Sequence, residues 1–77
     1  MHDVLKRGSK GEEVIALQTE LNALGCACDV DGHFGPATEQ AVKNFQQAFG
    51  LTADGIVGEH TRAKIAEQLA GDSSSNA

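Results

Sequence analysis

An eight-residue phrase occurs twice in this chain, first as Asp31-Gly32-His33-Phe34-Gly35-Pro36-Ala37-Thr38 and again as Asp54-Gly55-Ile56-Val57-Gly58-Glu59-His60-Thr61. Asp, Gly, an apolar residue, Gly and Thr recur in the same order, and the second copy starts 23 residues after the first, at Asp54 rather than Asp31. Beyond the phrase, Val42 and Ile65 are separated by the same interval. Repetition at a fixed interval in so short a chain indicates a small domain built from a duplicated turn-and-helix unit.

Each copy of the phrase predicts a tight turn followed by the start of a helix. Asp-Gly favours a turn because Asp bonds to its own backbone and Gly tolerates positive φ. Phe34 is expected to point inward and anchor the turn. Gly35 then marks the helix boundary, and Pro36 suits the first helical position, where its missing N–H would be unpaired in any case. Thr38 falls in the first turn, from which its side chain is expected to return a hydrogen bond to the Asp-Gly turn. The corresponding residues of the second copy are Val57, Gly58 and Thr61.

A helix is also expected before the first phrase. Ser9-Lys10-Gly11-Glu12 has the S-x-x-E form of a capping box, which places a helix start just before Val14. The apolar residues that follow, spaced i, i+3, i+7 and i+10, form a single stripe. Gly25 supplies the stop signal at the other end. The stripe consists of Val14, Leu17, Leu21 and Leu24.

Two more helices follow, from about Pro36 to Phe49, ended by Gly50, and from about Glu59 to Leu69. No alternating run is long enough for a sheet, so we predict an all-α three-helix bundle. Two Asp-Gly turn segments join its helices, with room for a single bridge of strand-like pairing. The core is small and its stability should be modest. Besides the first stripe, the predicted core residues are Val30, Phe34, Ala41, Val42, Phe45, Phe49, Leu51, Ile56, Val57, Ile65 and Leu69.

Length and composition restrict the possible functions. A chain of 77 residues allows one domain, predicted at residues 1–70, with a flexible Ser-rich tail or linker at 71–77. The net charge of −5 argues against nucleic acid as a partner. No apolar run is long enough to span a membrane, and the first residues lack a signal peptide. The lack of a signal peptide leads us to expect synthesis in a reducing cytoplasm, with later release of the protein from the cell possible. We also expect a monomer.

The cysteines and histidines do not predict a metal site or a catalytic centre. Cys26 and Cys28 are too close for a good mutual disulfide, and together with His33 they give three zinc ligands without a fourth. Residues 29–34 resemble the middle of a calcium loop, but the first and twelfth positions of that loop lack carboxylates. No nucleophile–base pair surrounds any histidine. We expect free thiols in a partly buried loop, no metal, no cofactor and no enzymatic activity.

In order, these residues resemble the peptidoglycan-binding domain of cell-wall hydrolases, a PGBD-like module of three helices, from about Leu5 to Leu69. The resemblance implies noncatalytic binding to bacterial peptidoglycan, at the cell wall in the periplasm or outside the cell, as an anchor for an attached hydrolase such as an endolysin. The chain departs from the family at Cys26-Ala27-Cys28 and at Arg62, where aromatic residues that stack on sugars are frequent. A cleft that hydrogen-bonds the peptide stem is compatible with both departures. The residues that carry the resemblance are Leu5–Gly11, Val14, Leu17-Gln18, Leu21-Asn22, Leu24-Gly25, residues 31–38, Ala41-Val42, Phe45-Gln46, Gly50-Leu51, residues 54–58 and Thr61.

The favoured ligand site lies beside the first repeat turn. There Asp31 and His33 flank a helix N-terminus whose N–H groups can hold a carboxylate of a stem peptide or muropeptide. The second turn is the competing site, and two polar residues of the first helix could line a groove between the turns. In the alternative interpretation, these side chains only tie their own turns together. The complete candidate set is Asp31, His33, Thr38, Gln18, Asn22, Asp54 and His60.

A different function remains open, in which the same fold packs on a partner enzyme and regulates it, as a protein-interaction or prodomain-like module. A prodomain that blocks a metalloenzyme would present a cysteine in a linker after the helices. Both cysteines of this chain lie between the first and second predicted helices, which disfavours that function.

Overall fold

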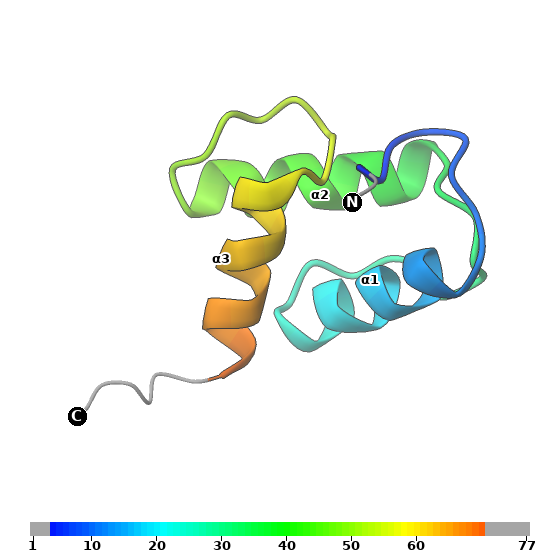
Figure 1. Cartoon of the computed structure of the whole chain (residues 1–77), viewed down its shortest axis with the longest axis horizontal. Helices are drawn as coiled ribbons and strands as arrows, with labels where there is room; N and C mark the ends of the chain where they lie inside the picture. Colours follow the sequence, from blue (N-terminus) through cyan, green and yellow to red (C-terminus); the bar gives the residue numbers. More distant parts are fainter. Residues whose placement is uncertain (1–3, 71–77) are drawn as a thin grey trace.

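Three helices make up the regular structure of the computed structural model, which describes residues 4–70. They are α1 (Glu12–Ala23), α2 (Pro36–Ala48) and α3 (Glu59–Leu69). α1 and α2 run one below the other across the view of Figure 1, α3 runs steeply beside them, and α1 packs against both. The predicted all-α three-helix fold is confirmed. The predicted tail at 71–77 and the N-terminal His2 lie outside the described residues.

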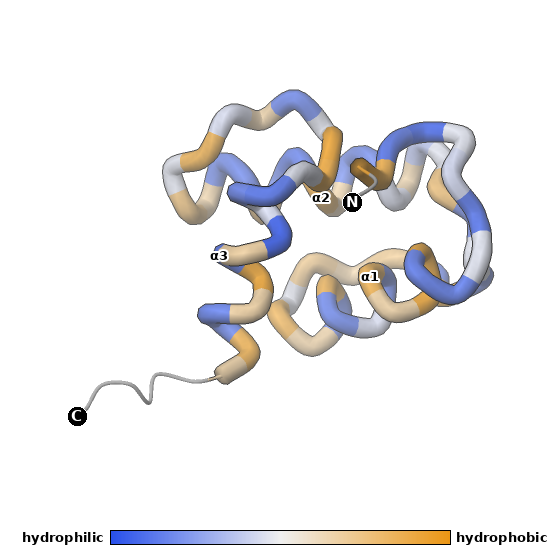
Figure 2. The backbone as a smooth tube through the Cα atoms, viewed as in Figure 1, coloured by the Kyte–Doolittle hydropathy of each residue, from blue (hydrophilic) through white to orange (hydrophobic). Residues whose placement is uncertain are grey.

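The core lies between the helices and includes residues from both repeat turns. Phe34 and Val57 are buried, so the inward anchors predicted for the turns are confirmed. Hydrophobic and hydrophilic positions alternate along α1 and α3 in Figure 2, as expected for helices with one buried face. No described helix is long and apolar enough to cross a membrane. The buried apolar residues are Leu5, Val14, Leu17, Leu21, Phe34, Ala41, Val42, Phe45, Val57 and Ile65, with Leu24, Cys26, Cys28 and Leu51 partly buried against them.

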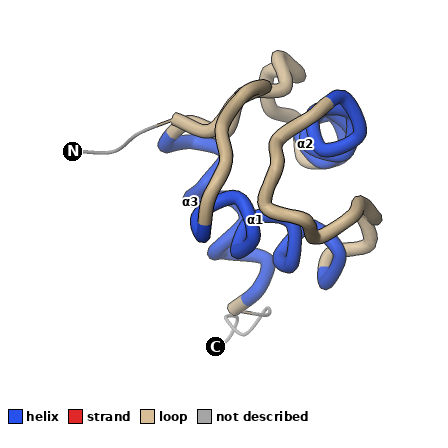
Figure 3. Tube along the Cα trace, turned by 90° about the vertical axis from the view of Figure 1, so that its right-hand side faces the viewer, coloured by secondary structure: helices blue, strands red, loops and turns tan. Residues whose placement is uncertain are grey.

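The segment before α1 connects the two repeat turns. Leu5 pairs with Val57 and Lys10 pairs with His33 in two isolated antiparallel bridges, where the sequence had allowed for one. Leu5 N–H donates to Val57 O at 3.1 Å, and Val57 N–H donates back at 2.8 Å. Within residues 4–70 the bridges do not extend into strands, and Figure 3 shows only helices and loops. Leu5 is therefore a core residue that the predicted core did not include.

The predicted capping box at the start of α1 is wrong. The N-cap residue is Gly11, and no side chain caps this end of the helix. The Ser9 hydroxyl instead accepts a hydrogen bond from Lys6 N–H at 3.1 Å. A serine hydroxyl can stabilise a local turn as readily as a helix end. Here the Ser9 hydroxyl stabilises the turn before α1.

Four apolar residues predicted to point inward are exposed: Val30, Phe49, Ile56 and Leu69. Ile56 precedes buried Val57 in extended chain, where neighbouring side chains point to opposite sides. Phe49 follows the last residue of α2, and its ring packs against Phe45 at a centroid distance of 4.6 Å while remaining half-exposed. Leu69 is the last residue of α3, whose buried residues, Thr61 and Ile65, lie earlier in the helix.

Candidate functional site

The side chain of Gln18 holds the first repeat turn to α1. It is fully buried, and its Nε2 donates to Asp31 Oδ1 at 3.1 Å, His33 O at 3.0 Å and Thr38 Oγ1 at 2.9 Å. Its Oε1 accepts the backbone N–H groups of Asp31 at 3.0 Å and Gly32 at 2.9 Å. We call these five residues the Gln18 cluster. Both the oxygen and the nitrogen of the amide form hydrogen bonds inside the fold, in agreement with the alternative interpretation that these side chains tie their own turns together.

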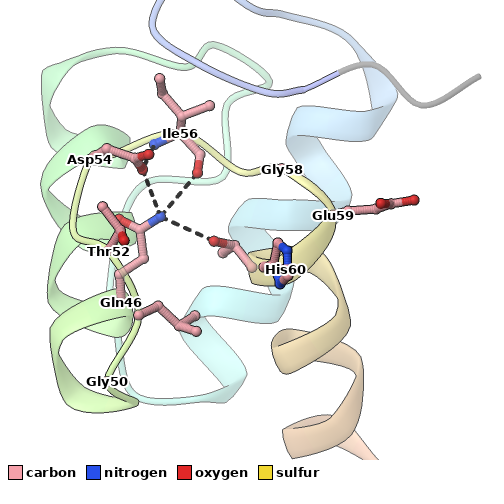
Figure 4. A pocket seen from close by; sticks show the side chains of 10 residues that line it. Gln46, Gly50, Thr52, Asp54, Ile56, Gly58, Glu59 and His60 are labelled. Carbon is pink, nitrogen blue, oxygen red and sulfur yellow. Dashed lines mark hydrogen bonds between the residues drawn. The ribbon is translucent and has the colours of Figure 1, made fainter.

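Gln46 does the same for the second repeat turn. Its Nε2 donates to Asp54 Oδ1 at 3.0 Å, Ile56 O at 3.0 Å and Thr61 Oγ1 at 3.1 Å, and Figure 4 shows these three bonds. Its Oε1 accepts Gly55 N–H at 2.9 Å. These five residues form the Gln46 cluster. The partners of the two glutamines stand at the same positions of the repeated phrase, so the duplication extends to the hydrogen-bond network.

The role predicted for the phrase threonines needs a correction. The Thr38 and Thr61 hydroxyls do not bond to the turns directly but accept hydrogen bonds from the two glutamine amides. The turn is closed instead by its own aspartate, because Asp31 Oδ1 accepts His33 N–H at 3.0 Å. Asp54 Oδ1 accepts Ile56 N–H at the same distance.

Hydrogen bonds lower the pKa of both turn aspartates. For Asp31 the N–H of His33 lowers the pKa most, followed by the Gln18 amide. For Asp54 the N–H of Ile56 has the largest effect, partly opposed by desolvation, and the Gln46 amide adds to the lowering. Hydrogen bonds to a carboxylate favour its charged form. Each repeat turn therefore carries a fixed negative charge at neutral pH.

A cavity of about 480 Å³ lies beside the second repeat turn, between the end of α2 and the start of α3. This volume lies within the range of small-molecule sites, about 300–1,000 Å³. Asp54 and His60, the competing site of the sequence analysis, are both at its wall, as Figure 4 shows. The lining residues are Gln46, Gly50, Leu51, Thr52, Asp54, Ile56, Gly58, Glu59, His60 and Thr61.

The loop after α1 covers the corresponding place in the first copy. The Asn22 amide donates to Cys28 O at 2.7 Å, and Cys28 N–H donates to Asn22 Oδ1 at 3.3 Å. The thiol of Cys28 lies 4.0 Å from Gln18 O. A groove lined by Gln18 and Asn22, as the sequence suggested, would require both amides to give up these internal bonds. Asp31 and His33 remain exposed at the first turn, and their binding role stays a prediction.

The two cysteines are free and partly buried, as expected from their spacing. Burial is the main cause that raises the pKa of each thiol, and the negative charge of Asp29 adds to the effect at Cys28. Raised pKa values keep these thiols protonated and poorly nucleophilic at neutral pH. Across residues 4–70, no three side chains of His, Cys, Asp or Glu lie close enough together to hold a metal ion.

Sequence reasoning missed two residues that shape this site, Gln46 and Thr61. Gln46 follows a buried Phe45 just as Gln18 follows a buried Leu17, so an apolar-Gln pair occurs on both helices. The interval from glutamine to aspartate is 13 residues in the first copy and 8 in the second. This difference in loop length hides the pair from a search at the fixed interval of the phrase.

The chain matches the family described as "Putative peptidoglycan binding domain" over residues 10–65. This match contains both glutamine clusters. The chain belongs to this family. It is 48% identical, over 79% of its length and 25% of the relative's, to a zinc D-Ala-D-Ala carboxypeptidase of Streptomyces albus G. It is 40% identical, over 95% of its length and 29% of the relative's, to a spore cortex-lytic enzyme of Bacillus cereus.

Solved structures agree with this family assignment. The N-terminal domain of SleB superposes with a TM-score of 0.84 at 40% identity, over 88% of this chain and 94% of that domain. The Burkholderia AP3 phage endolysin superposes with a TM-score of 0.83 at 39% identity, over 86% of this chain and 26% of the endolysin. The chain therefore spans less than a third of the two enzymes named above and nearly all of an isolated domain. The resemblance to a module of cell-wall hydrolases is confirmed.

Proposed function

We propose that this chain is a noncatalytic, monomeric module that binds the stem peptide of bacterial peptidoglycan in the cavity at the second repeat turn. In this proposal it holds an attached catalytic domain at the cell wall, outside the cytoplasmic membrane. The family membership supports peptidoglycan as the ligand. The chain spans less than a third of the length of these two relatives, which supports an attached domain.

One observation favours the second turn over the first: its glutamine cluster borders a cavity, whereas the loop of Cys28 covers the first cluster. The site residues of this proposal are Asp54 and His60 from the predicted set, with Thr61 added. In this proposal the second turn, beside the cavity, binds the ligand, and the first turn, which the loop of Cys28 covers, has a structural role only.

The lining of the cavity favours peptide over sugar. It includes no Phe, Tyr or Trp, the residues whose faces stack on sugar rings. Leu51 and Ile56 offer apolar contacts, while Thr61 and His60 offer hydrogen bonds. A stem peptide carries both small apolar side chains and amide or carboxylate oxygens. The cavity therefore suits a stem peptide better than a glycan strand.

Charge supports short-range recognition. The chain carries a net charge of −5, and the wall also carries carboxylates, so long-range attraction contributes little. The α3 N-terminus at Gly58 has no side-chain cap, and the partial positive charge of a helix N-terminus favours a carboxylate. We expect weak binding that changes little between low and moderate salt.

A pull-down on purified sacculi tests the proposal. We expect the chain to sediment with intact sacculi and to stay in solution with glycan from which an amidase has removed the stem peptides. Equal sedimentation with stripped glycan would move the site to the sugar, and no sedimentation with either would refute wall binding. Sacculi incubated with the chain alone should keep their turbidity, because the module has no catalytic centre.

A further inference from the structure

The side chain of Thr61 lines the cavity, and among residues 4–70 its hydroxyl accepts a hydrogen bond but donates none. Thr61 is only 5% exposed, and its oxygen accepts a hydrogen bond from the Gln46 amide at 3.1 Å. A hydroxyl also donates one hydrogen bond. No residue between 4 and 70 accepts that proton, although Thr61 forms part of the cavity wall. An acceptor of a ligand that enters the cavity can take this proton from a hydroxyl that the Gln46 amide already holds in place.

The first copy shows what satisfies the equivalent hydroxyl. Thr38 accepts a hydrogen bond from the Gln18 amide, and its side chain lies near the thiol of Cys28, whose pKa it lowers against the larger effect of burial. The backbone N–H and C=O of Cys28 are both held by Asn22. In the first copy, Cys28, which has a small side chain, thus lies against the Gln18 cluster as a residue of a bound peptide would.

The second copy differs from the first at the positions that correspond to Cys28 and to Asn22, the residue that binds the Cys28 backbone. The interval from glutamine to aspartate is shorter in the second copy, 8 residues rather than 13, so the second copy lacks the longer loop that carries Cys28 in the first. The position of Asn22, four residues after its glutamine, is taken by Gly50. A Cβ atom on Gly50 would meet no atom within 4 Å. Beside Gly50, the second copy therefore has a cavity where the first copy has Asn22 and the loop that Asn22 binds.

We propose that the cavity binds a peptide residue with an alanine-sized side chain in the place that Cys28 takes in the first copy, and that a carbonyl or carboxylate oxygen of this peptide accepts the Thr61 hydroxyl proton. This inference rests on the proposed function and narrows its ligand. Leu51 and Ile56 line the cavity and offer apolar contacts to that side chain.

Matched valine variants test the role of the hydroxyl. Thr61→Val and Thr38→Val each remove one hydroxyl that accepts a bond from a glutamine, so both should lower the melting temperature by similar amounts. Only Thr61→Val should lose binding of stem peptides released from sacculi by an amidase, by at least about tenfold, which corresponds to about 1.4 kcal/mol. Thr61→Ser, which keeps the hydroxyl, should bind within about twofold of the parent.

The titration is followed by NMR on the labelled chain, with acetyl-Ala-Ala and acetyl-Leu-Leu as additional probes. The methyl signal of Thr61 should shift in the parent while that of Thr38 does not, a readout that needs no variant. Acetyl-Ala-Ala should bind more tightly than acetyl-Leu-Leu. The inference is wrong if Thr61→Val binds like the parent, if Thr38→Val loses as much, or if the leucine probe binds equally well. In those cases the parent would still sediment with sacculi, whereas failure of the proposed function would abolish that sedimentation.

Discussion

The two repeat turns of this molecule are held by the same kind of glutamine cluster, but they differ in whether a loop covers that cluster. In both, a buried glutamine ties an Asp-Gly turn to a threonine in the first turn of the next helix. The first copy closes over this cluster with a longer loop, and the second leaves a cavity of about 480 Å³. The duplicated network therefore supports the fold in both copies, and the length of the preceding loop accompanies the difference that we propose for ligand binding.

The largest expected effect comes from removing the glutamines themselves. Gln18→Leu and Gln46→Leu keep the side-chain volume but leave buried N–H, C=O and hydroxyl groups without partners. We expect each to lower the free energy of unfolding by about 3–5 kcal/mol, a large part of the stability of a small domain. Gln18 makes five of these bonds and Gln46 makes four, so Gln18→Leu should cost more. Urea unfolding measures both, and losses below about 1 kcal/mol would show that the clusters do not hold the turns.

Glycine substitutions separate backbone strain from crowding. Gly50 and Gly55 both have positive φ, of 74° and 75°, but a Cβ on Gly55 would lie 2.8 Å from Glu39 Cγ. Gly50→Ala should therefore cost only the strain, about 1 kcal/mol, and Gly55→Ala about 2–3 kcal/mol. Gly32→Ala, with a contact of 3.2 Å to Ile15, should fall between them. Thermal melts that rank Gly50→Ala as the most damaging would contradict the packing at the turns.

The fold could be predicted because its signals are local and repeated. The Asp-Gly pairs, Pro36 and the apolar stripes each determine the structure of a few neighbouring residues, and the bounds of α3 agree with the prediction. The capping box failed because a nearby turn took the Ser9 hydroxyl. Such competition between two local partners depends on backbone geometry that the residue pattern does not contain.

The site was harder to predict because it depends on a long-range difference. Asp54 and His60 were in the predicted set, but the first turn was favoured because Asp31 and His33 flank a helix N-terminus that can hold a carboxylate. Only the three-dimensional structure shows that the loop with Cys28 covers the first cluster while the corresponding place beside Gly50 is open. The role that we propose for Thr61 depends on this opening, and no local pattern distinguishes Thr61 from Thr38.

A pair of histidine variants tests which turn binds. His60 is at the wall of the cavity, whereas His33 lies at the covered turn, and both side chains belong to exposed residues. We expect His60→Ala to weaken sedimentation with sacculi by about 3–10-fold, or roughly 1 kcal/mol, and His33→Ala to bind like the parent. Neither should change the melting temperature by more than about 4 °C, since exposed substitutions change stability by about 0.5 kcal/mol or less. The opposite order would return the site to the first turn.

The smallest effect concerns acid and should be the same in both copies. Hydrogen bonds place the pKa of folded Asp31 and Asp54 below the ordinary value of 3.8, so the folded state binds fewer protons than the unfolded state. The stabilisation is present above the ordinary value and is lost as the pH falls through the lower pKa of the folded state. Asp31→Asn and Asp54→Asn keep an oxygen that can accept the turn N–H but remove the charge, so each should flatten the acid side of the stability curve.

Asp29→Asn provides the matched control for these acid measurements. It removes a neighbouring exposed charge and leaves the hydrogen bonds of Asp31 and Asp54 within the turns intact. Urea midpoints measured from pH 6 down to pH 2.5 would show the comparison directly. An equal flattening in Asp29→Asn would mean that overall charge, rather than the bonds within the turns, controls the response to acid. A flattening in Asp54→Asn alone would mean that the two clusters are equivalent in geometry but not in energy.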